Sequence, residues 1–278
     1  MPRTSRVALF TLVQNDPVFL RKWLRHYCLA FSTSDIYVLD HDSVGDCRAA
    51  LFDLRDEWGF NLVSIHGDYS FASDWLLAQA CRFQSFLLAS YSVVVFAATD
   101  EFLVVNPQAA QRALQPLLLS RPMPFGSLRC QGWEVVHKRN EEPAIDPLEF
   151  SPWLPKRRWW YPAQRYSKPC VARTPTRWGP GFHTASNVPG GGGFVVDQEL
   201  LLLHLHRVDF DLCLARHRER ATRQWWPPSR EKSESCAVYR HNLIEDPEQL
   251  ERWLLCHADD TSKMATLSEI PVEIRNGL

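Results

Sequence analysis

The stretch that decides the fold is Ser92-Val93-Val94-Val95-Phe96-Ala97-Ala98-Thr99-Asp100-Glu101-Phe102-Leu103. Its first half is a run of β-branched and aromatic residues, which is typical of a strand buried on both faces. The run stops at two adjacent carboxylates, Asp100 and Glu101. Ligands of open α/β sheets bind beyond the carboxyl ends of the strands, so these acids stand where Mg²⁺ or Mn²⁺ could be held. A turn or a helix cap would use the same two acids, and the residues alone leave these interpretations open.

The segments before this strand alternate between strand and helix patterns. Apolar runs predict three further strands, at 7–13, 36–39 and 62–65. Helical spacing predicts a helix after each of them, the first with Asp16 as cap and Pro17 as first residue, then 49–58 and 73–88. This alternation indicates an α/β fold with a mainly parallel central sheet and helices on both faces.

The second half of the chain has a weaker pattern. A helix is expected over 108–119, a short strand at 194–196 and a basic helix over 210–223, whereas 121–193 is rich in Pro, Gly, Trp and Arg and is expected to form functional loops. Asp246 begins a capping-box helix with Leu250, Trp253 and Leu254 on one apolar stripe. We therefore expect a domain of residues 1–225 and a short C-terminal helical extension, 226–278, packed on it.

Composition excludes several classes of protein. The chain of 278 residues carries a net charge of −1, which argues against a nucleic-acid binder that relies on bulk attraction. Its eight cysteines are scattered without a CxxC pair, a spacing unlike that of a zinc site or a disulfide scaffold, so reduced thiols are expected. With no apolar run of the roughly 18 residues that a membrane span needs, the prediction is a cytoplasmic protein without a transmembrane segment, with peripheral membrane contact left open.

A second polar group, Asp40-His41-Asp42-Ser43, follows the second strand. Acids at two strand ends suggest a ligand with ribose hydroxyls and a metal-bound diphosphate. The same four residues would also make an ordinary turn.

The order of these motifs resembles glycosyltransferase family 2. The resemblance is carried by three stretches in sequence: Gln14-Asn15-Asp16 before Phe19-Leu20-Trp23-Leu24-His26-Tyr27, then Tyr37-Val38-Leu39-Asp40-His41-Asp42-Ser43, then Thr99-Asp100-Glu101-Phe102-Leu103. More closely, the chain is similar to the branch with N-E-x-x-F-L-x-E-W-L-x-H-H, D-N-x-S-x-D and D-x-D-E-F motifs. Downstream matches to that branch are Lys168-Pro169, Gly181-Phe182-His183 and Leu203-His204-Leu205-His206-Arg207. The resemblance covers roughly residues 6–220, and the order and spacing of the motifs are more specific than any single one.

The resemblance implies the type A fold of nucleotide-diphosphosugar transferases. It also implies transfer of a sugar from a nucleotide-diphosphate donor to a hydroxyl of a carbohydrate or other acceptor, with no nucleic-acid partner. Carried over by position, the nucleoside pocket would be lined by Asn15, Asp40 and Asp42. The metal, Mn²⁺ or Mg²⁺, would be held by Asp100 with help from Glu101 and a late histidine, for which His183, His204 and His206 are candidates. Lys168 and Arg207 would neutralise the leaving diphosphate.

One departure from the family pattern concerns the metal. The first Asp of D-x-D falls on Ala98, so Asp100 would hold the metal alone or with Glu101 as a substitute. The alternatives are a metal-independent enzyme, or a non-catalytic nucleotide-sugar or carbohydrate-binding protein with a degraded metal motif.

An inverting transfer needs a base within reach of the acceptor hydroxyl. Of the acids in the loop-rich middle, Glu134 is preferred because it follows Trp133, an aromatic side chain that could stack on a sugar. Glu141, Glu142 and Asp146 are the other candidates, and an ordinary surface role for Glu134 is the competing interpretation.

Overall fold

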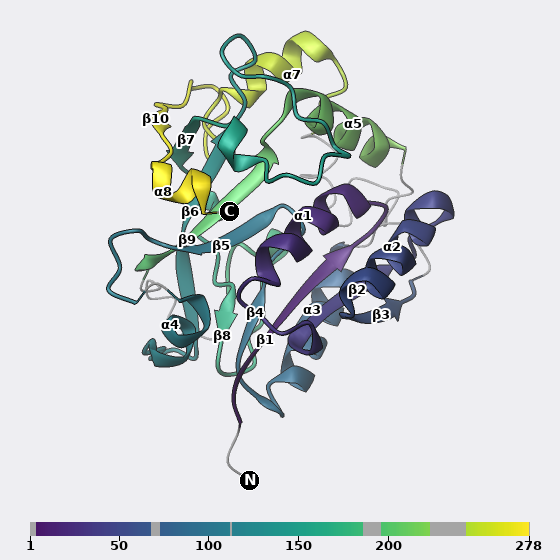
Figure 1. Ribbon diagram of the computed structural model, residues 1–278, viewed down its shortest axis with the longest axis vertical. Coiled ribbons are helices and arrows are strands. Elements are labelled where there is room, and N and C mark those ends of the chain that lie inside the picture. Colours follow the sequence, from purple (N-terminus) through teal and green to yellow (C-terminus); the bar gives the residue numbers. More distant parts are fainter. Residues whose placement is uncertain (1–3, 68–72, 112, 186–195, 223–242, 278) are drawn as a thin grey trace.

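The computed structural model describes residues 4–67, 73–111, 113–185, 196–222 and 243–277 (Figure 1). Its first half is a parallel sheet of β1 (Thr4–Val13), β2 (Ile36–His41), β3 (Asn61–Ile65) and β4 (Tyr91–Phe96), in the order β4-β1-β2-β3. The crossover helices are α1 (Pro17–Tyr27), α2 (Gly45–Trp58) and α3 (Ser73–Leu87). These elements confirm the α/β class and the alternation predicted from the sequence.

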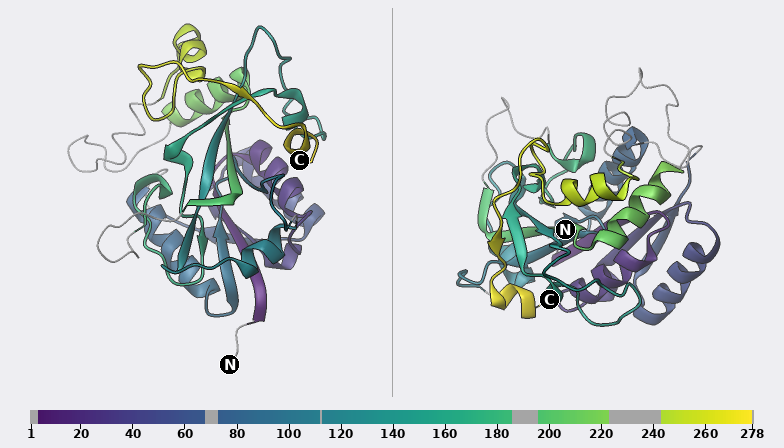
Figure 2. Two further views of the ribbon diagram at one scale, coloured as in Figure 1. Left: turned by 90° about the vertical axis from the view of Figure 1, so that its left-hand side faces the viewer. Right: turned by 90° about the horizontal axis from the view of Figure 1, so that it is seen from above.

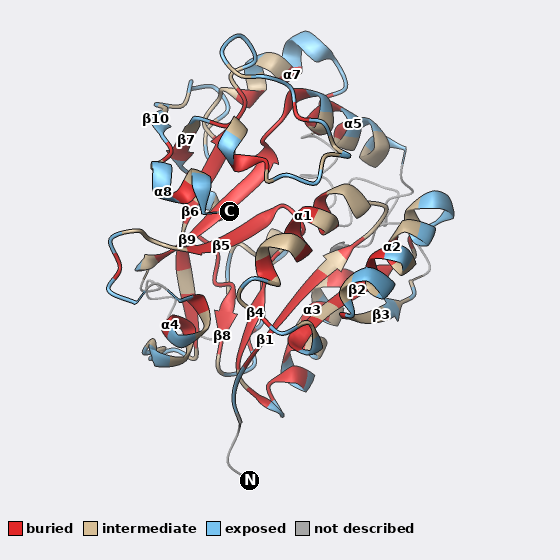
Figure 3. Cartoon of the chain, viewed as in Figure 1, coloured by how far each residue is buried: buried red, intermediate tan, exposed pale blue. Residues whose placement is uncertain are grey.

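The helices cover both faces of this sheet because alternate strand residues point to opposite faces. On β1, Val7 and Leu9 pack with α1, α2 and the helix α4 (Leu114–Ser120), whereas Ala8 and Phe10 pack with α3. Figure 3 shows the consequence, with buried central strands and exposed outer faces on the helices. The helix α1 contributes the buried Trp23, and burial of each such large apolar side chain contributes about 1.5–3 kcal/mol.

The second half of the sheet is mixed in direction. The strand β5 (Glu101–Val105) pairs antiparallel with β9 (Val196–Arg207), and β9 pairs parallel with β6 (Ser127–Val136). Three short strands complete the sheet, each antiparallel to its neighbours: β7 (Trp159–Pro162), β8 (Val171–Ala172) and β10 (Ser268–Glu269). Through β8, this half is joined to β4 and hence to the parallel half.

Two expectations for the second half were wrong. The helix expected over 108–119 begins only at Leu114, because the side chain of Asn106 accepts from the amide of Gln108 and holds a turn there. The segment expected to be loops contains β6, in which buried and half-buried residues alternate from Leu128 to Glu134. Two of the buried positions are Gly132 and Glu134, so the apolar residues alone do not show the strand pattern. The short helical turns η1 (Thr33–Asp35), η2 (Leu154–Lys156), η3 (Gln164–Tyr166) and η4 (Pro180–Phe182) supply much of the rest.

A glycine in β6 sets the position of the η3 segment. A Cβ on Gly132 would lie 2.2 Å from the carbonyl carbon of Tyr166, so only glycine lets the two backbones approach this closely. The amide of Gly132 also donates to the Ser167 hydroxyl at 3.0 Å. This contact brings Tyr166 and Lys168 against the sheet.

The C-terminal helices pack on the rest of the chain. The helix α7 (Pro247–Leu254) begins after Asp246 as predicted, and its Leu250 and Leu254 contact α5 (Phe210–Ala221). The last helix, α8 (Val272–Asn276), buries Ile274 in the main core. Figures 1 and 2 show α5 and α7 at the end of the molecule opposite the N-terminus. The predicted boundary at residue 225 lies outside the described residues, so the division into domain and extension stays a prediction. Among the described helices, the structure has no candidate for a membrane-spanning segment.

Candidate functional site

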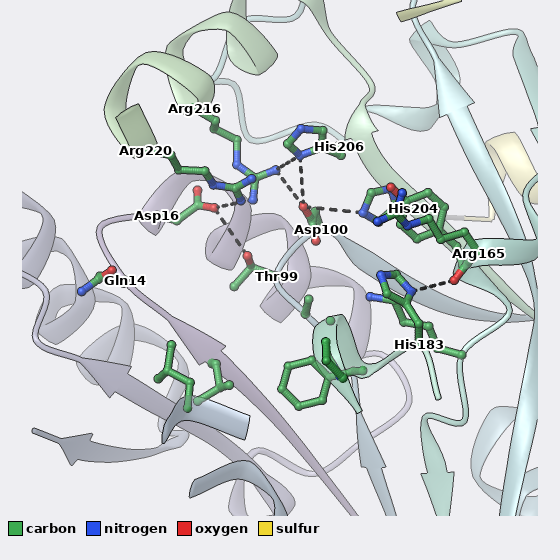
Figure 4. Close-up of a pocket in the computed structure, with 18 of the residues that line it drawn as sticks. Gln14, Asp16, Thr99, Asp100, Arg165, His183, His204, His206, Arg216 and Arg220 are labelled. Carbon is green, nitrogen blue, oxygen red and sulfur yellow. Dashed lines mark hydrogen bonds and ion pairs between the residues drawn. The ribbon is translucent and has the colours of Figure 1, made fainter. Parts of the chain in front are cut away.

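A cavity of about 320 Å³ opens beyond the carboxyl ends of β1 and β4, where the chain turns into β5. Across the cavity lie β9, α5 and the η3 and η4 segments (Figure 4). The charged side chains along its described wall are cations from the second half of the chain and aspartates mostly from the first: Arg165, Lys168, Arg207, Arg216, Arg220, Asp16, Asp74 and Asp100. Cations therefore outnumber carboxylates at this wall, which favours an anionic ligand.

Asp100 lies at the centre of this wall. Its Oδ2 atom accepts a hydrogen bond from Arg216 Nη1 at 2.8 Å and lies 3.6 Å from His206 Nδ1 and 3.9 Å from His204 Nε2. Burial by itself would raise the pKa of Asp100, but the charge of Arg216, together with His204 and His206, holds it well below its usual value. The side chain is therefore a carboxylate paired with an arginine.

Arg216 on α5 joins two carboxylates from distant parts of the chain. Its Nη2 donates to Asp16 Oδ2 at 2.9 Å while Nη1 binds Asp100, and its guanidinium lies 4.1 Å from the ring centroid of Phe19. Burial opposes the charge, but the two aspartates raise the pKa of Arg216. Loss of either partner would leave buried charge poorly compensated, which is strongly destabilising.

Glu101 points away from Asp100. Its Oε2 accepts from the amide of Ala98 at 3.0 Å, and its other oxygen forms an ion pair with Lys168. The amide of Glu101 in turn donates to the Ala98 carbonyl at 2.9 Å, so this acid closes the turn between β4 and β5. Of the two interpretations of the acid pair, the turn is the one that the structure shows for Glu101.

Glu134 and His204 form a buried pair on the adjacent strands β6 and β9. Both oxygens of Glu134, which is fully buried, lie 3.0 Å from His204 Nδ1. Because a carboxylate only accepts, Nδ1 carries a proton, and the neutral form of the imidazole has its lone pair on Nε2. The imidazole is stacked on the Tyr166 ring at 3.7 Å between centroids. Glu134 is absent from the described cavity wall whereas His204 is part of it, so the acid predicted as base reaches the cavity only through His204.

The remaining predicted cations and histidines have defined partners. Lys168 lines the cavity while paired with Glu101. Arg207 also lines the cavity, but its Nη1 donates to the backbone carbonyls of Leu254 and Cys256 and its guanidinium lies 3.8 Å from the Trp253 ring. It thereby ties the segment after α7 to the end of β9.

The other predicted metal ligand, His183, donates from Nδ1 to the Arg165 carbonyl at 2.7 Å. Burial, followed by the charge of Lys168, lowers its pKa to about 3. Figure 4 shows it on the far side of His204 from Arg216.

The three side chains predicted to line a nucleoside pocket do not line the described cavity. The oxygen of Asn15 accepts from the amide of Val44, and Asp40 Oδ1 accepts from the amide of Ser43, so both hold the loop after β2. Asp42 binds His66 Nδ1 at 2.6 Å at the end of β3. Side chains alternate along the chain, and the residues that do line the cavity are their neighbours Gln14 and His41.

Of the four residues predicted as metal ligands, the structure brings Asp100 and His206 together, whereas Glu101 is turned to Lys168 and His183 to the Arg165 carbonyl. Asp100 is occupied by Arg216, and Ala98 supplies no second carboxylate. In this arrangement the residues do not fit a Mg²⁺ or Mn²⁺ ion, which prefers several oxygen ligands. The other acids considered as base, Glu141, Glu142 and Asp146, are likewise absent from the described wall.

Two residues of the site were missed from the sequence. The sequence places Arg216 in a basic cluster, Arg216-His217-Arg218-Glu219-Arg220, that could bind small anions, and Asp16 at the cap of α1 and in the motif Gln14-Asn15-Asp16, but it assigns neither to the site. Asp16 caps α1 through Oδ1, which accepts from the amide of Phe19 at 3.4 Å, and it binds Arg216 through Oδ2. Local spacing carries no signal for a pair 200 residues apart in the chain.

No model of a known protein family matches the chain, and no curated protein is significantly similar to it. Among solved structures, the chain is similar to glucosyl-3-phosphoglycerate synthase from Mycobacterium tuberculosis, in a complex with Mn²⁺, uridine diphosphate and glucosyl-3-phosphoglycerate. That similarity has 14% identity and a TM-score of 0.29, over 46% of this chain and 43% of the synthase. The galactosyltransferase LgtC, in complex with donor and acceptor sugar analogues, is similar with 15% identity and a TM-score of 0.26, over 49% of either chain. This chain thus spans less than half the length of these proteins.

Proposed function

We propose that the protein is a glycosyltransferase that moves a sugar from a nucleotide-diphosphate donor to a hydroxyl of a carbohydrate or other acceptor. The observation that carries the proposal is one cavity in which a histidine backed by a buried carboxylate lies among cationic side chains. Its place beyond the carboxyl ends of β1 and β4 is where α/β sheets bind nucleotides. The family 2 resemblance of the motifs around Asp100 and His204 points to the same chemistry.

In the proposed reaction, His204 is the catalytic base and Glu134 is its positioning residue. The Nε2 lone pair of His204 takes the proton of the acceptor hydroxyl while the acceptor oxygen bonds to the anomeric carbon of the donor. Glu134, at 3.0 Å from Nδ1, holds the ring and stabilises the imidazolium that forms. The bond from the anomeric carbon to the diphosphate oxygen breaks, and the electron pair leaves with the diphosphate.

The charge of the leaving diphosphate is neutralised by the cations of the cavity wall. We assign this role to Lys168 and Arg220, which line the cavity, whereas the charge of Arg216 is balanced by Asp16 and Asp100. The guanidinium of Arg216 is held at Asp100, where the family resemblance expects a metal. Because the residues around Asp100 do not fit a divalent ion, no step of the proposed reaction passes through one.

The direct test is a binding and transfer screen with nucleoside diphosphates and their sugars, each with EDTA and with added Mn²⁺ or Mg²⁺. We expect one nucleotide to bind and its sugar to be transferred or slowly hydrolysed, with most of the binding retained in EDTA. Binding without any transfer over a panel of acceptors would favour the alternative of a non-catalytic nucleotide-sugar-binding protein. Absence of binding by every nucleotide would refute both.

A further inference from the structure

Three metal-binding side chains meet where α5 packs on the end of β9, and none of them has a role in the proposed sugar transfer. They are His206 at the end of β9, and Cys213 and His217 on α5, all buried. One ligand atom from each lies within 4.8 Å of the other two. In the part of the chain that the structure describes, no other group of three or more His, Cys, Asp or Glu side chains has its ligand atoms this close together.

We propose that His206, Cys213 and His217 form a zinc site, with the fourth coordination position directed to the cavity. Cys213 and His217 are four residues apart on α5, so they lie on the same face of the helix. That face packs against the end of β9, which supplies His206. A thiolate with two imidazoles is a ligand set that suits Zn²⁺ and does not suit Mg²⁺ or Mn²⁺.

The distances between the ligand atoms are close to those of a tetrahedral site. Zn–N bonds of about 2.05 Å and a Zn–S bond of about 2.3 Å require about 3.4 Å between nitrogens and about 3.6 Å from nitrogen to sulfur. In the structure, His206 Nε2 lies 2.9 Å from His217 Nε2, and Cys213 Sγ lies 3.8 Å from His217 Nε2. The ligand atoms of His206 and Cys213 lie within 4.8 Å of each other, so side-chain shifts of up to about 1 Å admit the ion.

The Ile244 carbonyl lies 3.2 Å from His217 Nδ1, in the place where zinc-bound histidines usually have an oxygen acceptor. His206 Nδ1 lies 3.2 Å from Arg216 Nη1 and 3.6 Å from Asp100 Oδ2. Because Arg216 only donates, His206 Nδ1 accepts from it in the metal-free protein, and His206 Nε2 donates its proton to His217 Nε2. His217 Nδ1 then donates to the Ile244 carbonyl. On zinc binding the proton of His206 Nε2 moves to Nδ1, beside Asp100 Oδ2.

Zinc binds Cys213 as the thiolate, so loading of the site releases one proton. His206 and His217 both line the cavity, which gives the ion a path of entry.

The experiment loads the metal-depleted full-length protein with Zn²⁺ or with Co²⁺, whose spectrum reports its ligands. We expect one ion per chain by elemental analysis, and for Co²⁺ a thiolate-to-metal charge-transfer band with the visible absorption of a four-coordinate ion. Cys213→Ser should abolish the charge-transfer band and weaken metal binding at least about 100-fold. Cys81→Ser is the matched control, because it removes a half-buried thiol on α3, away from the proposed site. It should change neither the charge-transfer band nor the metal affinity.

The wild-type spectrum alone can overturn the proposal. A chain that takes up no stoichiometric Zn²⁺ or Co²⁺, or a cobalt spectrum without a thiolate band, excludes the site even if the Cys213 variant fails to fold. His217→Asn is a second variant that should lose the metal while keeping all cysteines. The outcome is independent of sugar transfer, since no donor or acceptor is present.

Discussion

The contact between Glu134 and His204 offers the sharpest test of the proposed mechanism. Glu134→Gln keeps the size of a fully buried side chain but removes the charge that faces His204 Nδ1 at 3.0 Å. A hydrogen bond to a charged group contributes about 1.5–3 kcal/mol. If Glu134 makes this contribution by stabilising the imidazolium in the transition state, kcat of the Glu134→Gln variant should fall by a factor of about 10 to 160.

The readout is sugar transfer measured under steady-state conditions with the donor found by the binding screen. We expect the loss in kcat, with KM for the donor nearly unchanged, because Glu134 does not contact the cavity. A merely structural role would instead lower the melting temperature without this division between kcat and KM.

A double-mutant cycle separates the two residues from their surroundings. In the His204→Ala background, Glu134→Gln should cost little further activity, because Glu134 then has no base to position. Wild-type activity in the Glu134→Gln single variant, or the same fractional loss in both backgrounds, would refute the assignment of His204 as base.

Three further outcomes follow from the structure. Asp100→Asn leaves Arg216 with Asp16 as its only described carboxylate partner and should lower the free energy of unfolding by about 3–5 kcal/mol, measured by denaturant titration. The folded-state pKa of Asp100 lies below its unfolded value of about 4, so its contribution is complete above that pH and is lost as the pH falls toward the folded pKa. Wild type should therefore lose more stability than Asp100→Asn when both are taken below pH 4, and parallel pH profiles would contradict this. Gly132→Ala places a Cβ 2.2 Å from the Tyr166 backbone and should displace the segment that carries Lys168, so that donor affinity falls, and an unchanged donor affinity in a folded variant would contradict this. Leu250→Ala removes a fully buried side chain between α7 and α5 and should cost about 2–5 kcal/mol in chemical unfolding, and a cost below 1 kcal/mol would show that α7 is not packed there in solution.

The sequence by itself determined the parallel half of the fold and the place of Asp100. Strand runs, helix caps at Asp16 and Asp246, and apolar spacing are local signals, because propensity and periodicity act over a few residues. They predicted β1 to β4 with α1 to α3, and a carboxylate at the end of β4, where ligands of α/β sheets bind.

Only the tertiary structure decided what the polar residues do. Arg216 reaches Asp100 across 116 positions in the chain, Glu134 reaches His204 across 70, and His206 meets Cys213 and His217 only because β9 packs on α5. A scan for CxxC pairs misses this last group, which has a single cysteine and takes its third ligand from a strand. The pairing of β6 with β9 also joins two segments that lie far apart in the chain. Contacts between distant segments are set by how helices and strands pack, and packing depends on side chains that lie far apart in the sequence.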